Sequence, residues 1–178
     1  FSAGALSTQG VFSGSVVLTD AQKAIVMAGQ TYANVHTEAN PGGEIRGQIA
    51  PVLMQAELSS ANERPDPVEG PAHGLGILQL VGNQLTMNVT YEELSGVATA
   101  SHVHGPASTS LPAGVLQPLD SLNGGAYGTS GSLSGTLTLT DDQLAHVVDG
   151  LTYINFHTMN HVTGELRGQI LPQVAGIP

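Results

Sequence analysis

The sequence contains no cysteine. This absence excludes disulfides, catalysis by a thiol, and zinc or iron–sulfur sites with cysteine ligands. It does not decide the compartment, because a cysteine-free chain suits the cytosol as well as the cell exterior. Tryptophan is also absent, and aromatic residues make up only 4% of the chain. A core must therefore be built mainly from valine, leucine, isoleucine and alanine.

Positive charge is equally scarce. Four lysines and arginines stand against fourteen acidic residues, which gives a net charge of −10. Binding to nucleic acid requires cationic side chains that displace counterions from phosphates, so no nucleic acid partner is expected. No apolar run approaches the roughly 18 residues of a spanning helix, so no membrane insertion is expected. The chain begins at Phe1 and shows no signal peptide, as expected of a processed or excerpted chain.

An internal repeat dominates what is present. Residues 10–51 align without a gap with residues 131–172, at a constant offset of 121, and 22 of the 42 positions are identical. Each copy begins with a capping box, Thr19–Gln22 or Thr140–Gln143, which predicts a short helix ending near Gly29 or Gly150. A hairpin should follow each helix, with strands at 32–37 and 44–49, and at 153–158 and 165–170.

A glutamate and an arginine recur in the second strand of each predicted hairpin. Glu44 and Arg46 stand at i and i+2, as do Glu165 and Arg167. Residues two apart on a strand project from the same face. We therefore expect each pair to be partly buried and joined by an ion pair, with a structural rather than a catalytic role.

These repeated residues also carry a family resemblance. Tyr-x-Asn-x-His-Thr followed by Gly-Glu-[Ile/Leu]-Arg-Gly-Gln-[Ile/Leu] resembles the closing motif of CHRD domains, the modules named after chordin. The segment His102–Ala107 resembles the family's other signature, a His-x-His-Gly-Pro sequence. The resemblance implies a partial module at residues 1–51, equivalent to the C-terminal part of the repeat, and a complete module at 52–178. It also implies a secreted β module, mostly without an assigned activity.

The remaining pattern predicts a mainly β fold. Residues 74–81 and 84–91 flank Gly82-Asn83 and are expected to form a hairpin, with Leu85, Met87, Val89 and Tyr91 alternating toward the core. Further strands are expected at 11–18, 99–105, 115–119 and 133–139. The predicted architecture is an antiparallel β-sandwich or barrel, Greek-key-like, with one short helix per repeat. The proline-rich segment 62–71 is expected to be an exposed loop.

The seven histidines carry the clearest chemistry. His102 and His104 stand at i and i+2 on a predicted strand, so both rings should project from one face. Imidazoles in that arrangement can share a metal ion. His157 is the natural third ligand, and His161, four residues further on, is a candidate fourth. A site of three or four histidines without sulfur suits Cu(II) or Zn(II).

A structural interpretation of the same residues stays open. The histidine of the closing motif recurs as His36 in the partial module, where any upstream His-x-His partner would lie before Phe1. The repeated ring could therefore simply bond to the backbone and fix the turn. His161 aligns with Asn40 and is not part of the repeated motif. His73 and His146 are expected at the surface.

Two functions follow from these observations. The first is a non-enzymatic, secreted (or periplasmic) module that has a structural role, binds a protein partner or self-associates. The second is a copper or zinc protein, whose enzymatic extreme would resemble superoxide dismutase. No Gly-x-Ser-x-Gly elbow is present, so no catalytic residue is predicted. We further expect residues 1–51 to pack on a second module, in the same chain or in a neighbouring one, because a half-module would expose strand edges.

Overall fold

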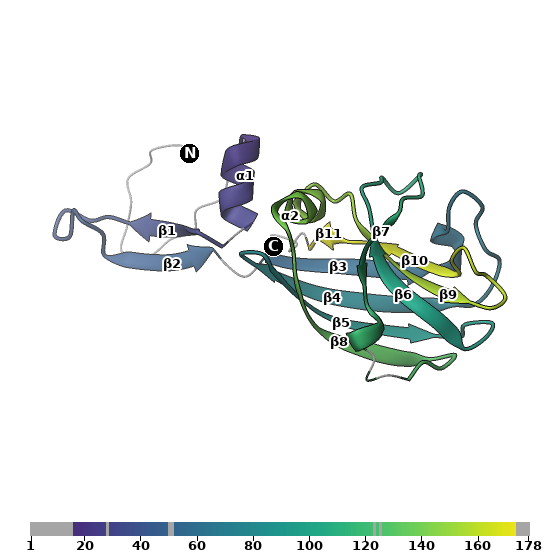
Figure 1. Ribbon diagram of the computed structural model, residues 1–178. Coiled ribbons are helices and arrows are strands. Elements are labelled where there is room, and N and C mark those ends of the chain that lie inside the picture. The colour runs from purple at the N-terminus through teal and green to yellow at the C-terminus, as the bar shows by residue number, and fades with distance from the viewer. Residues whose placement is uncertain (1–15, 28, 50–51, 123, 125, 174–178) are drawn as a thin grey trace.

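A computed structural model describes residues 16–27, 29–49, 52–122, 124 and 126–173 (Figure 1). A small N-terminal unit contains one helix and a two-stranded sheet, and a larger unit contains a single nine-stranded antiparallel sheet. In the part of the chain that the structure describes, no helix has the length and apolar character needed to cross a membrane.

The N-terminal unit consists of α1 (Asp20–Met27), β1 (Thr31–Val35) and β2 (Ile45–Ile49). The larger unit begins with β3 (Val52–Ser59), the 3₁₀ turn η1 (Ser60–Asn62), β4 (His73–Val81) and β5 (Gln84–Glu92). It continues with β6 (Ala98–His104), β7 (Val115–Pro118), η2 (Asp120–Leu122) and β8 (Gly131–Thr138). It ends with α2 (Asp141–Val148), β9 (Tyr153–Thr158), β10 (Leu166–Gln169) and β11 (Leu171–Pro172).

The large sheet curls into a half-barrel, so that its two ends face each other. Its strand order is β7-β6-β9-β10-β3-β4-β5-β8, with β11 also pairing with β3. Strands β6, β7 and β9 cross in front of β3, β4, β5 and β8 (Figure 1). Tyr91 on β5 and Phe156 on β9 meet across this interior, with ring centroids 4.4 Å apart. The two halves of one sheet therefore enclose a common core, as in a sandwich.

The alternation predicted for the central hairpin is confirmed. Strands β4 and β5 flank a turn in which Gly82 has φ +60°, and Leu85, Met87, Val89 and Tyr91 are all buried. Both capped helices are also confirmed, with the full capping box at Thr140 and Gln143. Gly29 and Gly150 follow the two helices with φ +68°. The mainly β, antiparallel class with one short helix per repeat is thus correct.

Two expectations from the sequence differ from the structure. The strand expected at 11–18 lies mostly outside the described residues, and residues 16–18 are not in a strand. The loop 62–71 is not exposed throughout, because Glu63 is buried within it, with 3% of its surface exposed. The proline and acidic residues of this segment predicted the loop, but they did not predict that the carboxyl group of Glu63 would be buried.

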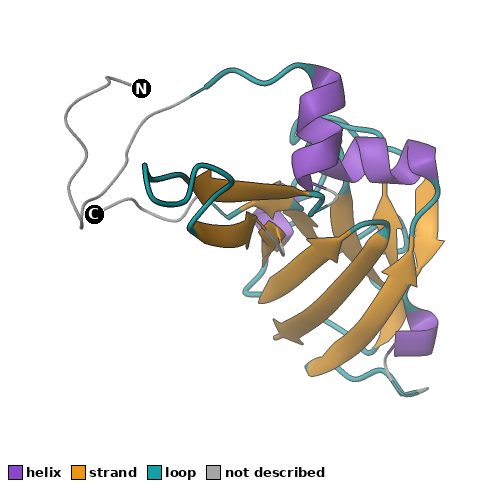
Figure 2. Ribbon diagram, turned by 90° about the vertical axis from the view of Figure 1, so that its left-hand side faces the viewer, coloured by secondary structure: helices purple, strands orange, loops and turns teal. Residues whose placement is uncertain are grey.

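The two units touch through their helices. Helix α1 lies against α2, and Lys23 forms an ion pair with Asp149 there (Figure 2). The hairpin β1–β2 extends away from the curled sheet (Figure 1), and every residue of β2 is exposed. Extensive packing of residues 1–51 on the rest of the same chain, one of the two arrangements expected from the sequence, is therefore not seen for the described residues.

Candidate metal centre

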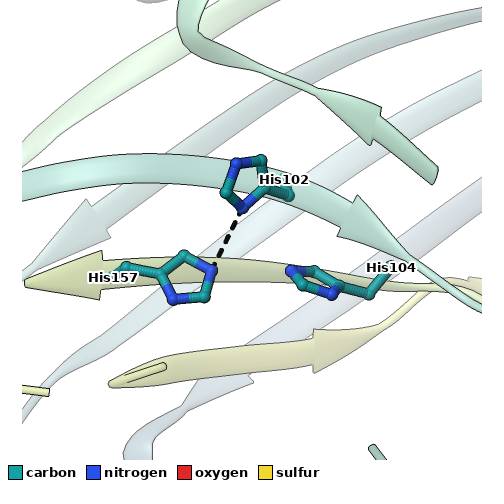
Figure 3. A group of neighbouring side chains, drawn as sticks. All are labelled: His102, His104 and His157. Atoms are coloured by element: carbon teal, nitrogen blue, oxygen red, sulfur yellow. Dashed lines mark hydrogen bonds between the residues drawn. The ribbon is translucent and has the colours of Figure 1, made fainter. Parts of the chain in front are cut away.

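Three histidines meet because β6 and β9 are neighbouring antiparallel strands. The register pairs His102 with Asn155, His104 with Tyr153, and Ala100 with His157. Directly opposed residues share a face of the sheet, and so do residues two apart on one strand. All three imidazoles therefore project from the same face, as Figure 3 shows.

The rings are close enough to serve one ion. One nitrogen from each of His102, His104 and His157 lies within 4.8 Å of the other two. Nδ1 of His102 and Nε2 of His157 are 3.1 Å apart (Figure 3). In a tetrahedral site with metal–nitrogen bonds of about 2.1 Å, ligand atoms lie roughly 3.4 Å apart. The ligand nitrogens must therefore approach one another by roughly 1.4 Å at most. Rotation of the imidazole rings can supply this movement.

Backbone carbonyls orient two of these rings. Nδ1 of His104 is 3.0 Å from the carbonyl oxygen of Ala113, and Nδ1 of His157 is 3.2 Å from that of Val162. A carbonyl only accepts, so each Nδ1 must donate its proton, and the lone pair of each neutral ring is on Nε2. In His157 this Nε2 faces Nδ1 of His102. Bonds of this kind commonly fix the tautomer of metal-bound histidines. Nε2 of His104 is buried and has no hydrogen-bond partner among the described residues, which suits a position reserved for a ligand.

Burial keeps the rings of His104 and His157 neutral, which metal ligation requires. Burial, together with the adjacent His102, lowers the pKa of His157 to about 4. Burial also lowers the pKa of His104, although the bond to Ala113 opposes this shift. The neighbouring His102 opposes protonation of both rings, because like charges would crowd one small volume.

Comparison with known proteins agrees with the motifs around these histidines. The family model of the CHRD domain matches residues 2–49 and 54–170. The chain belongs to the CHRD domain family. No curated protein and no solved structure matches it. The two matched stretches are separated at 50–53, where β2 is followed by β3, and each includes one copy of the CHRD closing motif.

The fourth candidate ligand lies elsewhere in the CHRD module. His161 does not belong to the group formed by the other three histidines among the described residues. It lines a different surface hollow, together with Glu63 and Gly164. Its backbone amide bonds to Thr158, which places it in the turn beyond β9. Of the two expected surface histidines, His73 is exposed, and His146 is half-buried on α2.

The structural interpretation of the repeated histidine is also realised. Nδ1 of His36 is 2.8 Å from the carbonyl oxygen of Pro41, which matches the bond from His157 to Val162. The closing-motif histidine thus ties together its own turn in both copies. This role uses Nδ1, and a metal would use Nε2, so the two interpretations are compatible in the second copy.

The predicted ion pairs between the repeated glutamates and arginines are wrong. Glu165 and Arg167 are each 2% exposed, but they have different partners. Glu165 accepts bonds from Ser95 and Thr158, whereas Arg167 donates to the carbonyl oxygen of Ser108. Burial would raise the pKa of Glu165, but its hydrogen bonds from Thr158 and Ser95 lower it below the usual value. Glu44 and Arg46 are both exposed, so partial burial fails in the first copy.

Sequence reasoning missed a stack of side chains beside the histidines. The rings of His104 and Tyr153 are parallel within 9°, with centroids 5.1 Å apart. The guanidinium of Arg167 lies 3.6 Å from the Tyr153 centroid. The recurrence of tyrosine and arginine as Tyr32 and Arg46 was the available signal. Nothing in the sequence marked the buried Glu63, whose pKa burial raises to about 7.

Proposed function

We propose that this CHRD module binds one Cu(II) or Zn(II) ion through His102, His104 and His157. The observation that carries the proposal is the buried Nε2 of His104, which has no partner among the described residues and belongs to a cluster whose ligand atoms lie within 4.8 Å of one another. Three neutral imidazoles are a donor set that both ions accept.

The proposed role is non-enzymatic. Among the described residues, the histidine group contains no carboxylate. The net charge of −10 would also repel an anionic substrate such as superoxide. These observations argue against the superoxide dismutase-like alternative. A secreted location is part of the proposal, supported by the CHRD match and the presence of a single lysine.

Calorimetric titration of the untagged, chelator-treated chain with Cu(II) and with Zn(II) tests this function. We expect one ion per chain for at least one metal, and a loss of affinity of at least about tenfold in His104→Ala. His146→Ala is the matched control, because this ring lies on α2 outside the cluster. Equal affinities in the two variants, or no binding by the parent chain, would refute the proposal.

A second function, association with another CHRD chain, is supported by the exposed hairpin. Tyr32, Ile45 and Ile49 are 49%, 64% and 47% exposed. Their equivalents in the complete module, Tyr153, Leu166 and Ile170, are 2%, 0% and 0% exposed. Among the described residues, strands β1 and β2 pair only with each other, so their outer edges are available there for strand addition.

Sedimentation velocity over a range of concentrations tests this association. The parent chain should form dimers or larger species, and the double variant Ile45→Lys/Ile49→Lys should stay monomeric, because two charges replace the apolar contact. Leu75→Lys/Ile77→Lys is a suitable control, since these side chains are exposed to a similar degree, 42% and 43%, on β4. A monomeric parent chain at all concentrations would exclude self-association.

A further inference from the structure

A polar pocket lies on the outside of the curled sheet, where β3, β10 and β11 meet. Its volume is about 570 Å³. Few residues are paired between the strands here. Strand β10 pairs with β3 only at Arg167 and Ser59, and β11 pairs with β3 further along, at Gln55 and Met54. The pocket walls carry side-chain amides from Gln55, Asn62, Gln169 and Gln173. This lining offers hydrogen bonds beside an apolar surface of similar extent, to which Leu171 and Pro172 contribute.

Two of the four cationic residues of the chain line this pocket. Arg64 and Arg167 are 103 positions apart in the sequence, and the fold brings both to this pocket. The chain as a whole has a net charge of −10. Neither forms an ion pair within the described residues. Burial lowers the pKa of Arg167, and the like charge of Arg64 adds to this effect. Such a concentration of positive charge in an acidic protein favours an anionic ligand.

The two guanidinium groups retain free donors. Arg167 donates through Nη2 to Ser108 and Gln169, while its buried Nη1 has no partner among the described residues. Arg64 is half-buried, and its hydrogen bonds to Ala61 and to the carbonyl oxygen of Glu63 both use Nη1. Guanidinium donors match carboxylates in geometry and charge.

Acidic neighbours limit how much negative charge the pocket accepts. Glu57 lies in the lining, where it accepts a bond from Gln55. Glu63 lies behind the two arginines and is bonded to Asn155. With these groups nearby and a strongly acidic chain around them, a ligand with several negative charges would be repelled. A ligand with one carboxylate and several hydroxyl groups fits better.

We propose that this pocket binds a uronate, an acidic sugar whose carboxylate lies between Arg64 and Arg167 and whose hydroxyls bond to the surrounding amides. The neutral amides and the hydroxyl of Thr109 are suitable partners for ring hydroxyls. Leu171 and Pro172 can cover a C–H face of the ring. This site is separate from the histidine cluster and does not depend on a metal.

NMR titration of the full-length chain with D-glucuronate tests the proposal, and D-glucose is the matched neutral probe. We expect glucuronate to shift the side-chain amide signals of Gln55, Asn62 and Gln173, and glucose to bind at least about tenfold more weakly. Arg64→Gln should weaken glucuronate binding by a similar factor. Arg46→Gln changes the net charge equally, but Arg46 lies over Tyr32 outside the pocket, so binding should be unchanged.

A second variant guards against misfolding of Arg64→Gln. Gln173→Glu adds a negative charge at the exposed rim of the pocket and should also weaken glucuronate binding. The proposal is overturned if glucuronate leaves these amide signals unchanged, if glucose binds as tightly, or if folded Arg64→Gln and Gln173→Glu both bind like the parent chain.

Discussion

The two copies of the CHRD closing motif share the same internal contacts but have very different surroundings. In the first copy Arg46 lies 3.7 Å from the Tyr32 ring, and in the second Arg167 lies 3.6 Å from Tyr153. Gln48 bonds to the carbonyl oxygen of Gly29 at 2.7 Å, and Gln169 bonds to that of Gly150 at 2.8 Å. The motif therefore forms its helix, turn and hairpin contacts without help from the rest of a module.

Burial separates the copies. Arg46 and Glu44 are exposed, whereas Arg167 and Glu165 are almost completely buried. The difference arises because β6 covers one side of the β9–β10 hairpin and β3 covers the other, and the described first copy has no such neighbours. The same residues should thus contribute little to stability in one copy and much in the other. The following predictions test that difference, from the largest expected effect to the smallest.

Replacing the repeated arginine should give the largest difference in stability loss between the two copies. Arg167→Ala removes the hydrogen bond to Ser108 and the stacking on Tyr153, and leaves buried groups without partners. We expect a loss of about 3–4 kcal/mol in the free energy of unfolding. Arg46→Ala should cost less than about 1 kcal/mol, because its ring contact is exposed to solvent. Urea denaturation measures both values, and equal losses would contradict the role assigned to burial.

The histidine of the second copy, His157, should make the stability of the fold depend on pH. The pKa of His157 is about 4 in the folded chain, against an ordinary value of 6.5. Because the folded-state pKa is depressed, this ring stabilises the fold above pH 6.5, and that contribution is lost as the pH falls toward 4. In chelator-treated, metal-free protein, we expect the free energy of unfolding to fall by about 2–3 kcal/mol between pH 6.5 and pH 4 from this ring alone.

The measurement compares urea denaturation of the parent chain with His157→Asn at several pH values. The difference in free energy of unfolding between the two should change by this amount between pH 6.5 and 4. A parallel pH dependence in the parent chain and His157→Asn would show that this ring is not shielded from protonation.

The repeated glutamate gives a smaller contrast. Glu165→Gln weakens charge-assisted bonds from Ser95 and Thr158, for an expected cost of about 2 kcal/mol at pH 7. Because the pKa of Glu165 is lowered in the folded chain, its contribution to the free energy of unfolding is lost as the pH falls below 4.5. Glu44→Gln should leave stability nearly unchanged, since its bonds to Thr37 and Asn40 are exposed. Thermal unfolding at pH 7 distinguishes the two outcomes.

The contact between the units should matter least. Lys23 and Asp149 form an ion pair whose side chains are 39% and 51% exposed. Lys23→Gln should therefore lower the free energy of unfolding by about 0.5 kcal/mol or less. A loss well above 1 kcal/mol in urea denaturation would show that α1 and α2 are coupled more strongly than this exposed contact indicates.

Local patterns predicted much of the fold and part of the site. The capping boxes, the alternation along Gln84–Tyr91 and the i, i+2 spacing of His102 and His104 each depend on residues close in sequence, and each is realised. The partners of Glu165 and Arg167 were not predictable in this way. They come from Ser95 and Ser108, which only the pairing of distant strands brings near. The buried Glu63 depends on the same long-range packing.

Nitrogen-15 NMR of the seven imidazole rings during addition of Zn(II) tests most directly whether the surroundings, rather than the motif itself, create the metal centre. The account predicts that one equivalent shifts the ring signals of His102, His104 and His157. The signal of His36, which makes the same backbone bond without the His-x-His strand beside it, should remain in place. His161 should also be unaffected. A shift of His36 equal to that of His157, or no shift of His104, would contradict the account.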